Sequence, residues 1–367
     1  MSAKVSIVKC RTYDREDVRR GVKKALDLLG GITQFIKKGD RVLIKPNLLS
    51  ARPVEDNVCT NLEVIRAVVR LVREAGGMPL IGDNPGGSVS PKKVYEDSGI
   101  AALAAEEKAE LKEVENVKMV NGIPMASYLF ECDKIINLPK MKTHSLMGLT
   151  GAVKNMYGMV AGLYKTQRHK DFPAPADFAK VLADVFEIKK PALSLMDGII
   201  SMDREGPSSG RLRNTWLLIA SEDGVALDSV FSALIGMKPL DLLTTREAHK
   251  RGLGEADLGN IEILGGALED HMIEGFELPG TGKIIGILGP FAGFAASFVR
   301  FQPRINQRRC RKCRVCLQSC PVYAIIIDEK RQFIDPGKCL RCMCCHEVCP
   351  YKAIELKRNA LARAFGL

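Results

Sequence analysis

The first 280 residues alternate between short apolar runs and longer amphipathic stretches. The apolar runs predict strands at residues 5–9, 41–45, 78–81, 134–138, 192–196, 216–220 and 261–264. The amphipathic stretches predict helices at residues 14–29, 60–76, 175–189 and 224–235, and the capping-box sequence Thr60-Asn-Leu-Glu63 opens the second of them. Strands that are apolar on both faces and alternate with helices are typical of an α/β layered fold with a largely parallel sheet.

Polar residues follow several of the predicted strands. Asn47 comes shortly after Lys45, the last residue of the second strand, and Asp83 and Asn84 follow the third strand. In parallel sheets, ligands bind in the loops at the C-terminal ends of the strands, so these groups predict one binding cleft. The further candidates for binding a substrate or cofactor in the same cleft are Lys140, Lys154 and Asn155.

The stretch 139–145 contributes the candidate catalytic groups. If this stretch is extended, Lys140, Lys142 and His144 share one face and form a cationic patch with a titratable imidazole. We expect the lysines to hold a carboxylate or phosphate, and His144 or Asp197 to supply a proton. The predicted catalytic residues are therefore Lys142, His144 and Asp197. A solvated loop at 139–145, and a helix cap or turn at Asp197, remain the alternatives.

Eight of the twelve cysteines form two copies of the spacing C-x2-C-x2-C-x3-C-P. This bacterial-ferredoxin pattern is typical of paired [4Fe–4S] clusters, in which the fourth cysteine of each run ligates the other cluster. The first cluster is assigned to Cys310, Cys313, Cys316 and Cys349, and the second to Cys339, Cys342, Cys345 and Cys320. Cys344 is off the pattern, and we expect that it is not a ligand.

Other uses of these cysteines fit less well. Zinc ribbons have a longer gap between their C-x2-C halves, and a disulfide framework implies an oxidising compartment. The C-x3-C-x2-C triplet of radical S-adenosylmethionine enzymes is absent. The N-terminal residues carry no export signal, so we expect a cytoplasmic protein, and oxygen-sensitive clusters suit an anaerobic cell.

The net charge of +11 is concentrated in the C-terminal region. Residues 300–367 carry 15 Lys and Arg against 5 Asp and Glu, whereas the other residues carry 39 against 38. Nucleic acid is one interpretation of this charge, but no nucleic-acid-binding motif accompanies it and aromatic residues make up only 6% of the chain. We expect instead an acidic redox protein, such as a ferredoxin or flavodoxin, with a solvated basic face as the alternative.

Three segments follow from these patterns: an α/β domain at 1–280, an apolar and then basic linker at 281–303, and a two-cluster ferredoxin domain at 304–367. The uncharged stretch 284–299 is shorter than the roughly 20 residues of a spanning helix and is broken by Pro290. We expect no transmembrane segment, and peripheral membrane contact stays an alternative to a buried linker.

The motifs resemble a known family. KPN at 45–47, GDNPGG at 82–87, NLPKMKTH at 137–144, GAVKNMYG at 151–158 and MDGI at 196–199 are similar to those of the family called domain of unknown function 362. Members of this family often carry a C-terminal two-cluster ferredoxin domain, as this chain does. The resemblance implies an α/β domain with a ligand site built from these motifs, and it implies no particular reaction.

Two functions fit this sequence. The first is an iron–sulfur oxidoreductase whose two [4Fe–4S] clusters exchange single electrons with a small anionic substrate held by the α/β domain. An additional organic cofactor in that domain stays open. The second is a non-catalytic electron-transfer protein whose α/β domain only docks a partner redox enzyme.

Overall fold

The computed structural model describes residues 2–86, 90–162, 164–280, 301–329 and 331–358. Strands of the α/β domain are β1 (Ala3–Lys9), β2 (Arg41–Pro46), β3 (Met78–Gly82), β4 (Glu110–Lys112), β5 (Val117–Val120), β6 (Ile123–Ala126), β7 (Lys134–Leu138), β8 (Lys140–His144), β9 (Gly148–Leu149), β10 (Leu193–Asp203), β11 (Arg211–Ser221) and β12 (Ile261–Leu264). Its helices are α1 (Arg15–Asp27), α2 (Leu62–Glu74), α3 (Pro91–Asp97), α4 (Ile100–Glu106), α5 (Tyr128–Glu131), α6 (Ala152–Asn155), α7 (Tyr164–Asp171), α8 (Pro175–Ile188), α9 (Gly224–Leu234) and α10 (Leu243–Lys250).

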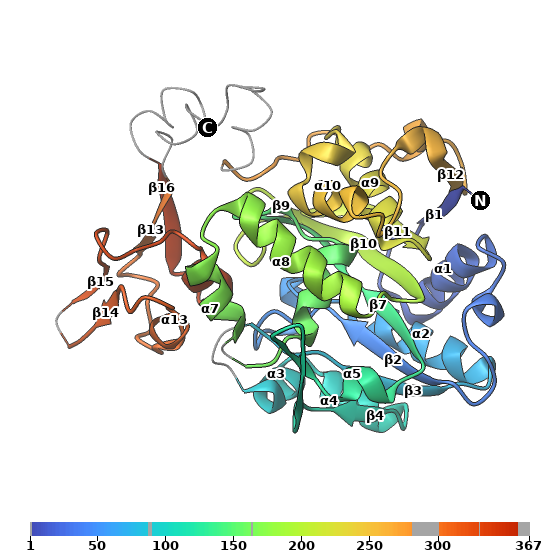
Figure 1. Ribbon diagram of the computed structural model, residues 1–367, viewed down its shortest axis with the longest axis horizontal. Coiled ribbons are helices and arrows are strands. Elements are labelled where there is room, and N and C mark those ends of the chain that lie inside the picture. Colours follow the sequence, from blue (N-terminus) through green and yellow to red (C-terminus); the bar gives the residue numbers. More distant parts are fainter. Residues whose placement is uncertain (1, 87–89, 163, 281–300, 330, 359–367) are drawn as a thin grey trace.

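A mostly parallel sheet forms the middle layer of this domain (Figure 1). Its order is β12-β1-β11-β10-β7-β2-β3-β4, and β8 and β9 extend from β10. The pairs β2–β3, β2–β7, β3–β4, β7–β10 and β1–β12 are parallel, whereas β11 pairs antiparallel with both β1 and β10. Helices cover both faces, which confirms the α/β layered fold.

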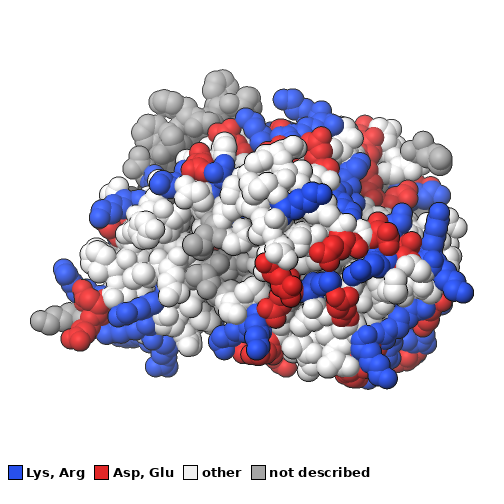
Figure 2. All heavy atoms as spheres, turned by 60° about the horizontal axis from the view of Figure 1, so that its bottom comes forward, with Lys and Arg blue, Asp and Glu red and all other residues white. Residues whose placement is uncertain are grey.

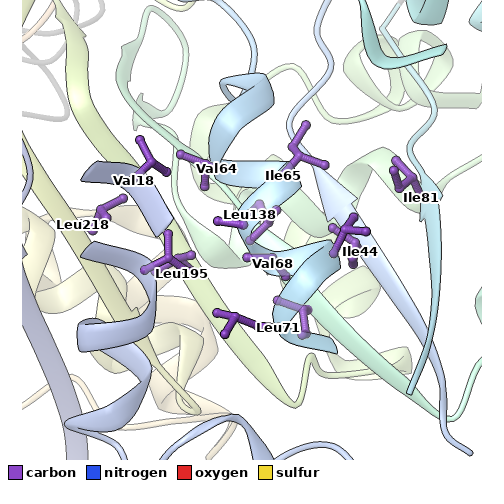
Figure 3. Close-up of a cluster of buried hydrophobic side chains, with 14 of the residues drawn as sticks. Val18, Ile44, Val64, Ile65, Val68, Leu71, Ile81, Leu138, Leu195 and Leu218 are labelled. Atoms are coloured by element: carbon purple, nitrogen blue, oxygen red, sulfur yellow. The ribbon is translucent and has the colours of Figure 1, made fainter. Parts of the chain in front are cut away.

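The alternation of side chains in the strands divides the core between the two faces. In β2, Val42 and Ile44 point to the layer of α1 and α2, while Leu43 points to the layer of α8. Figure 3 shows the first of these layers, where Val64 and Val68 of α2 pack against strand residues such as Ile44. Burial on both faces explains why the strands are continuously apolar in sequence.

Two local predictions are wrong in detail. The N-cap of α2 is Asn61, whose side chain accepts the Glu63 N–H, so Thr60 does not form the predicted capping box. Thr60 instead donates its hydroxyl to the Leu138 carbonyl at 2.7 Å and accepts the Asn47 N–H at 2.8 Å. These two bonds tie the ends of β2 and β7 together, and they occupy the hydroxyl that a cap would need.

The β10 strand is longer than predicted. Asp197 does not follow the strand but lies inside it, just before a register shift between Gly198 and Ile200. The stretch 139–145 is also not a solvated loop, because β8 is a fully buried strand that pairs parallel with β10. The extended alternative for Lys140, Lys142 and His144 is therefore the correct one.

The cluster domain consists of β13 (Phe301–Ile305), α13 (Val315–Gln318), β14 (Ile325–Ile327), β15 (Gln332–Ile334), α14 (Cys344–Val348) and β16 (Ile354–Arg358). Its outer strands β13 and β16 pair antiparallel, as do β14 and β15. The ferredoxin-like domain is thus confirmed. Most of the predicted linker, including the apolar stretch 284–299, lies outside the described residues, and residues 301–303 already belong to β13. None of the helices that the structure describes is long and apolar enough to cross a bilayer.

Candidate functional site

A cavity of about 90 Å³ lies where the C-terminal ends of β2 and β3 meet the cluster domain. The structure brings together there all the predicted binding residues except Lys45, namely Asn47, Asp83, Asn84, Lys140, Lys154 and Asn155. The location agrees with the general position of ligand sites in such sheets. The predicted catalytic residues Lys142, His144 and Asp197 lie nearby but do not line the cavity.

Lys45 lies behind the cavity and holds Asp83 in place. Its Nζ is 2.9 Å from Asp83 Oδ1, and the Leu48 N–H donates to Asp83 Oδ2 at 2.8 Å. Burial lowers the pKa of Lys45, and the Asp83 carboxylate offsets part of this effect. A Cβ at Gly158 would come within 2.0 Å of Asp83 Oδ1, so the close packing requires glycine there. This ion pair adds no net charge to the site.

Asp197 forms a second buried network, with Lys140 and Tyr13. Lys140 Nζ lies 2.8 Å from Asp197 Oδ2, and the Tyr13 hydroxyl donates to Oδ1 at 2.7 Å. The Asn61 N–H also donates to Oδ2 at 3.0 Å. Burial, followed by the Asp197 carboxylate, raises the pKa of Tyr13 well above its usual range. Both carboxylate oxygens are engaged and fully buried, so the structure gives Asp197 the contacts of a structural partner rather than those of a proton donor in the cleft.

Lys142 and His144 are also fully buried. Lys142 Nζ donates to the Val58 carbonyl at 2.5 Å, and burial lowers its pKa to about 7. His144 Nδ1 accepts the N–H groups of Leu146 and Met147 at 3.2 Å, which leaves Nε2 as the protonated nitrogen. Nε2 lies 3.0 Å from Glu347 Oε1 in the cluster domain. Burial lowers the pKa of His144 to about 4, so the ring is neutral at neutral pH and donates to a carboxylate.

Cationic side chains are in excess around the cavity. Within the described residues, Lys154 Nζ makes no hydrogen bond or ion pair, although Glu347 interacts with it electrostatically. In the part of the chain that the structure describes, Lys165 Nζ bonds only to backbone carbonyls, those of Asn84, Pro85 and Gly158. Burial lowers the pKa of both lysines, and that of Lys165 to about 7.

An unpartnered imidazole completes this part of the lining. The ring of His169 stacks on Phe178 at a centroid distance of 4.1 Å, and its buried Nδ1 has no hydrogen-bond partner among the residues that the structure describes. Burial lowers the pKa of His169 to about 4. The α/β domain thus presents cations and free polar atoms that its own carboxylates do not satisfy.

Helix α14 of the cluster domain closes the cavity. Cys344, Glu347 and Val348 line it, and their spacing of i, i+3 and i+4 places them on one face of a helix. Cys344 also borders a second small cavity, which is lined by the thiols of Cys320, Cys339, Cys342 and Cys345. The same turn of helix therefore separates the candidate ligand cavity from the predicted site of the second cluster.

Three hydrogen bonds besides that of His144 attach the Cys345–Cys349 stretch to the α/β domain. Arg52 donates to the Cys349 carbonyl at 2.7 Å. Ser208 donates to the His346 carbonyl, and the His346 ring donates to the Glu205 carbonyl, both at 3.1 Å. These contacts hold α14 against the cavity.

Electrostatic contacts link the thiols of the motif cysteines to one another. The thiols of Cys349, Cys313 and Cys310 interact electrostatically with Cys316, and with burial they raise its pKa to about 12. Cys345 interacts in the same way with Cys342, Cys339 and Cys320, and also with Cys316 of the neighbouring group. Groups of thiolates repel one another unless cations lie between them, as the irons of a [4Fe–4S] cluster do, and the assignment of these cysteines to two clusters stays a prediction.

Sequence reasoning missed Lys165 and Glu347. Lys165 follows the GAVKNMYG motif at 151–158 by only a few residues, and a lysine in a polar stretch gives no signal of burial. Glu347 lies between two cysteines of the second run. Its acidic side chain in an otherwise basic domain was the clue that the sequence offered.

Comparisons with known proteins agree with this architecture. The model of the domain of unknown function DUF362 matches residues 42–233, and that of a 4Fe-4S dicluster domain matches residues 302–350. The thylakoid-associated protein sll1697 of Synechocystis is 33% identical over 260 residues, which cover 69% of this chain and 81% of that protein. Among solved structures, the lactate racemase apoprotein of Thermoanaerobacterium thermosaccharolyticum is 15% identical with a TM-score of 0.36, over 61% of this chain and 54% of that one.

Proposed function

The chain belongs to the DUF362 family and carries a 4Fe-4S dicluster domain, and from this premise we propose that it is an iron–sulfur oxidoreductase. Its substrate or organic cofactor would bind in the cavity between the two domains. The clusters, when they are present, would supply single electrons to that molecule or accept them from it. The chain's own residues bind the reacting molecule, exclude water from it and position its protons.

The observation that carries this proposal is the shared wall of the cavity. A molecule bound there contacts the α/β domain on one side and the α14 residues Cys344 and Glu347 on the other. Cys345, a predicted ligand of the second cluster, lies on the same short helix. A protein that only docked a partner would have no need for a buried polar cavity beside its cluster.

The charges of the cavity favour an acidic ligand. The pairs Lys45–Asp83 and Lys140–Asp197 are neutral, and Glu347 balances one further cation. Lys154 and the protonated form of Lys165 together exceed that balance by one charge. Burial disfavours the protonated form of Lys154, and a carboxylate or phosphate beside its Nζ would stabilise that form. The size of the cavity suits a small acid or the acidic end of a larger molecule.

His169 is the proton-handling group that this geometry favours. His169 lines the cavity and its Nδ1 has no hydrogen-bond partner among the described residues, whereas His144 does not line the cavity and lies 3.0 Å from Glu347, and both oxygens of Asp197 have partners. At neutral pH the His169 ring is neutral, so it can donate one hydrogen bond to the ligand and accept a proton elsewhere on the ring. We assign to His169 the role that the sequence suggested for His144 or Asp197.

An acidic redox protein is the proposed electron partner. Cys313 is exposed, Tyr323 is 82% exposed, and basic residues such as Arg311 and Arg314 flank the first cysteine run. By contrast, Figure 2 shows acidic and basic side chains intermixed over the α/β domain. The predicted first cluster would thus receive the partner's electron, while the second lies beside the cavity.

The test is to identify what the cavity holds. The protein is purified without oxygen and denatured, and any released small molecule is identified by mass spectrometry. We expect an acidic molecule in stoichiometric amount from the wild type and little from Lys154→Gln, with equal iron in both. Lys180→Gln is the matched control, because Lys180 is exposed and paired with Asp177.

Release of only iron and sulfide would favour the alternative, a non-catalytic electron-transfer protein. That alternative also predicts a stable complex with a redox enzyme in anaerobic extracts. A neutral molecule, or equal release from Lys154→Gln, would contradict the assignment of the acidic ligand.

A further inference from the structure

Arg52 is a buried cation of the α/β domain that reaches the cluster domain. It lies in the loop after β2, its side chain is 2% exposed, and Nη2 donates to the Cys349 carbonyl at 2.7 Å. Nη1 donates to Asp56 Oδ2 at 3.0 Å. The Nε–H has no acceptor among the residues that the structure describes.

This arrangement is costly without a further partner. A buried guanidinium needs its donors satisfied and its charge balanced, and Asp56 is about one-third exposed, so it screens that charge incompletely. The unpaired donor lies on the side chain that touches Cys349, which is assigned to the first cluster with Cys310, Cys313 and Cys316. An oxidised cluster with four thiolates carries a charge of about −2, and its sulfurs accept hydrogen bonds.

We propose that Arg52 hydrogen-bonds the sulfur shell of the cluster that Cys349 ligates and raises the reduction potential of that cluster. Reduction adds one electron from an external low-potential donor and makes or breaks no bond. The cluster becomes more negative by one charge, so the contact with Arg52 is stronger in the reduced form. This assignment rests on the cluster-ligand part of the proposed function, and it holds whether or not the protein turns over a substrate.

The position of Arg52 gives this effect a consequence for the cavity. The loop that carries it begins with Asn47, Leu48 and Leu49, which line the cavity. A stronger bond in the reduced form also means, by linkage, that reduction holds α14 more firmly against the α/β domain. Arg52 therefore couples the redox state of one cluster to closure of the ligand site.

The test is a redox titration of the full-length holoprotein, with dithionite as the electron donor and electron paramagnetic resonance as the readout. We compare the wild type with Arg52→Gln, Arg52→Lys and the control Arg19→Gln. Arg19 is exposed and pairs with Glu16 in α1, so it gives the same loss of charge far from the cysteines in sequence. Iron and sulfide content is measured for each variant.

In Arg52→Gln we expect about a tenfold smaller equilibrium constant for reduction of one cluster, which is a midpoint about 59 mV lower. The other cluster should change much less, Arg19→Gln should match the wild type, and Arg52→Lys should lie between. Unchanged midpoints, or equal shifts of both clusters, would overturn the proposal. If Arg52→Gln does not retain its iron, the Arg52→Lys variant tests the proposal. A midpoint of Arg52→Lys equal to that of the wild type would overturn the proposal, and a lower midpoint would support it.

Discussion

Asp197→Asn distinguishes a structural role of this carboxylate from the catalytic role that its sequence position suggested. The substitution keeps the shape of the side chain but removes its charge. Lys140 then stays fully buried without a counter-charge, since its other hydrogen-bond partner among the described residues is the Tyr13 hydroxyl at 2.6 Å. Tyr13 also loses its charged acceptor, so both neighbours are affected.

The expected cost follows from the burial of the pair. Both side chains of the Lys140–Asp197 pair are 0% exposed. Removing one partner of such a pair costs about 3–5 kcal/mol of unfolding free energy, because it leaves an uncompensated buried charge. For a domain of this size that corresponds to a fall in unfolding temperature of roughly 5–9 °C. The double variant Asp197→Asn/Lys140→Met should recover part of the loss, since it removes the orphaned cation as well.

The assay is thermal unfolding of the anaerobic holoprotein, followed by far-ultraviolet circular dichroism. Asp177→Asn is the control, because its pair with Lys180 is at least half exposed and should contribute less than about 1 kcal/mol. Wild-type stability of Asp197→Asn would refute the reasoning. A double variant as unstable as the sum of the two single variants would refute it as well.

Three further predictions concern other parts of the molecule. Burial lowers the pKa of His169 to about 4, so the unfolded chain binds a proton between about pH 6.5 and 4 that the folded chain does not. His169 alone should therefore lower the stability on acidification through this window by at most roughly 3 kcal/mol, so the total fall, to which His144 also contributes, should be smaller in His169→Gln, as denaturation midpoints across pH will show. Cys344→Ala should keep the full iron and sulfide content, whereas Cys345→Ala should lose iron, because only Cys345 fits the ligand spacing. The double variant Arg311→Glu/Arg314→Glu should be reduced more slowly by an acidic ferredoxin at low salt, and a rate in stopped-flow measurements that is unchanged and independent of salt would contradict this.

The sequence predicted the strands best where they are buried on both faces. A continuous apolar run such as 41–45 has few alternatives, because only a central strand of a covered sheet buries both of its faces. It predicted β8 less well, since lysines alternating with Met141 also fit a partly buried loop. The deciding interaction is long-range: Lys140 can lie in a fully buried strand because Asp197, distant in sequence, neutralises it there.

Long-range pairing of charges also limited how well the candidate site could be predicted from the sequence. The polar residues at strand ends were predicted to converge because parallel strands end at one edge, and most of them do line one cavity. What no local pattern could show is which groups neutralise one another inside the fold. His144 seemed the natural acid or base by residue type, yet it lies 3.0 Å from Glu347 of the cluster domain and outside the cavity lining, whereas His169 lines the cavity.

The short stretch from Cys342 to Cys349 connects these findings. A cluster motif needs its cysteines at fixed spacing, but that spacing leaves the intervening positions open to other uses. In α14 the helical period turns Cys344, Glu347 and Val348 towards the cavity, while Cys345 borders the second small cavity with the other thiols of its group. A carrier ferredoxin would expose this face to solvent, whereas here His144, Ser208 and Arg52 bind this stretch to the α/β domain. Contact at this face is what an enzyme needs if electrons are to pass between a cluster and a buried ligand, and it is the reason we prefer the oxidoreductase to the docking protein.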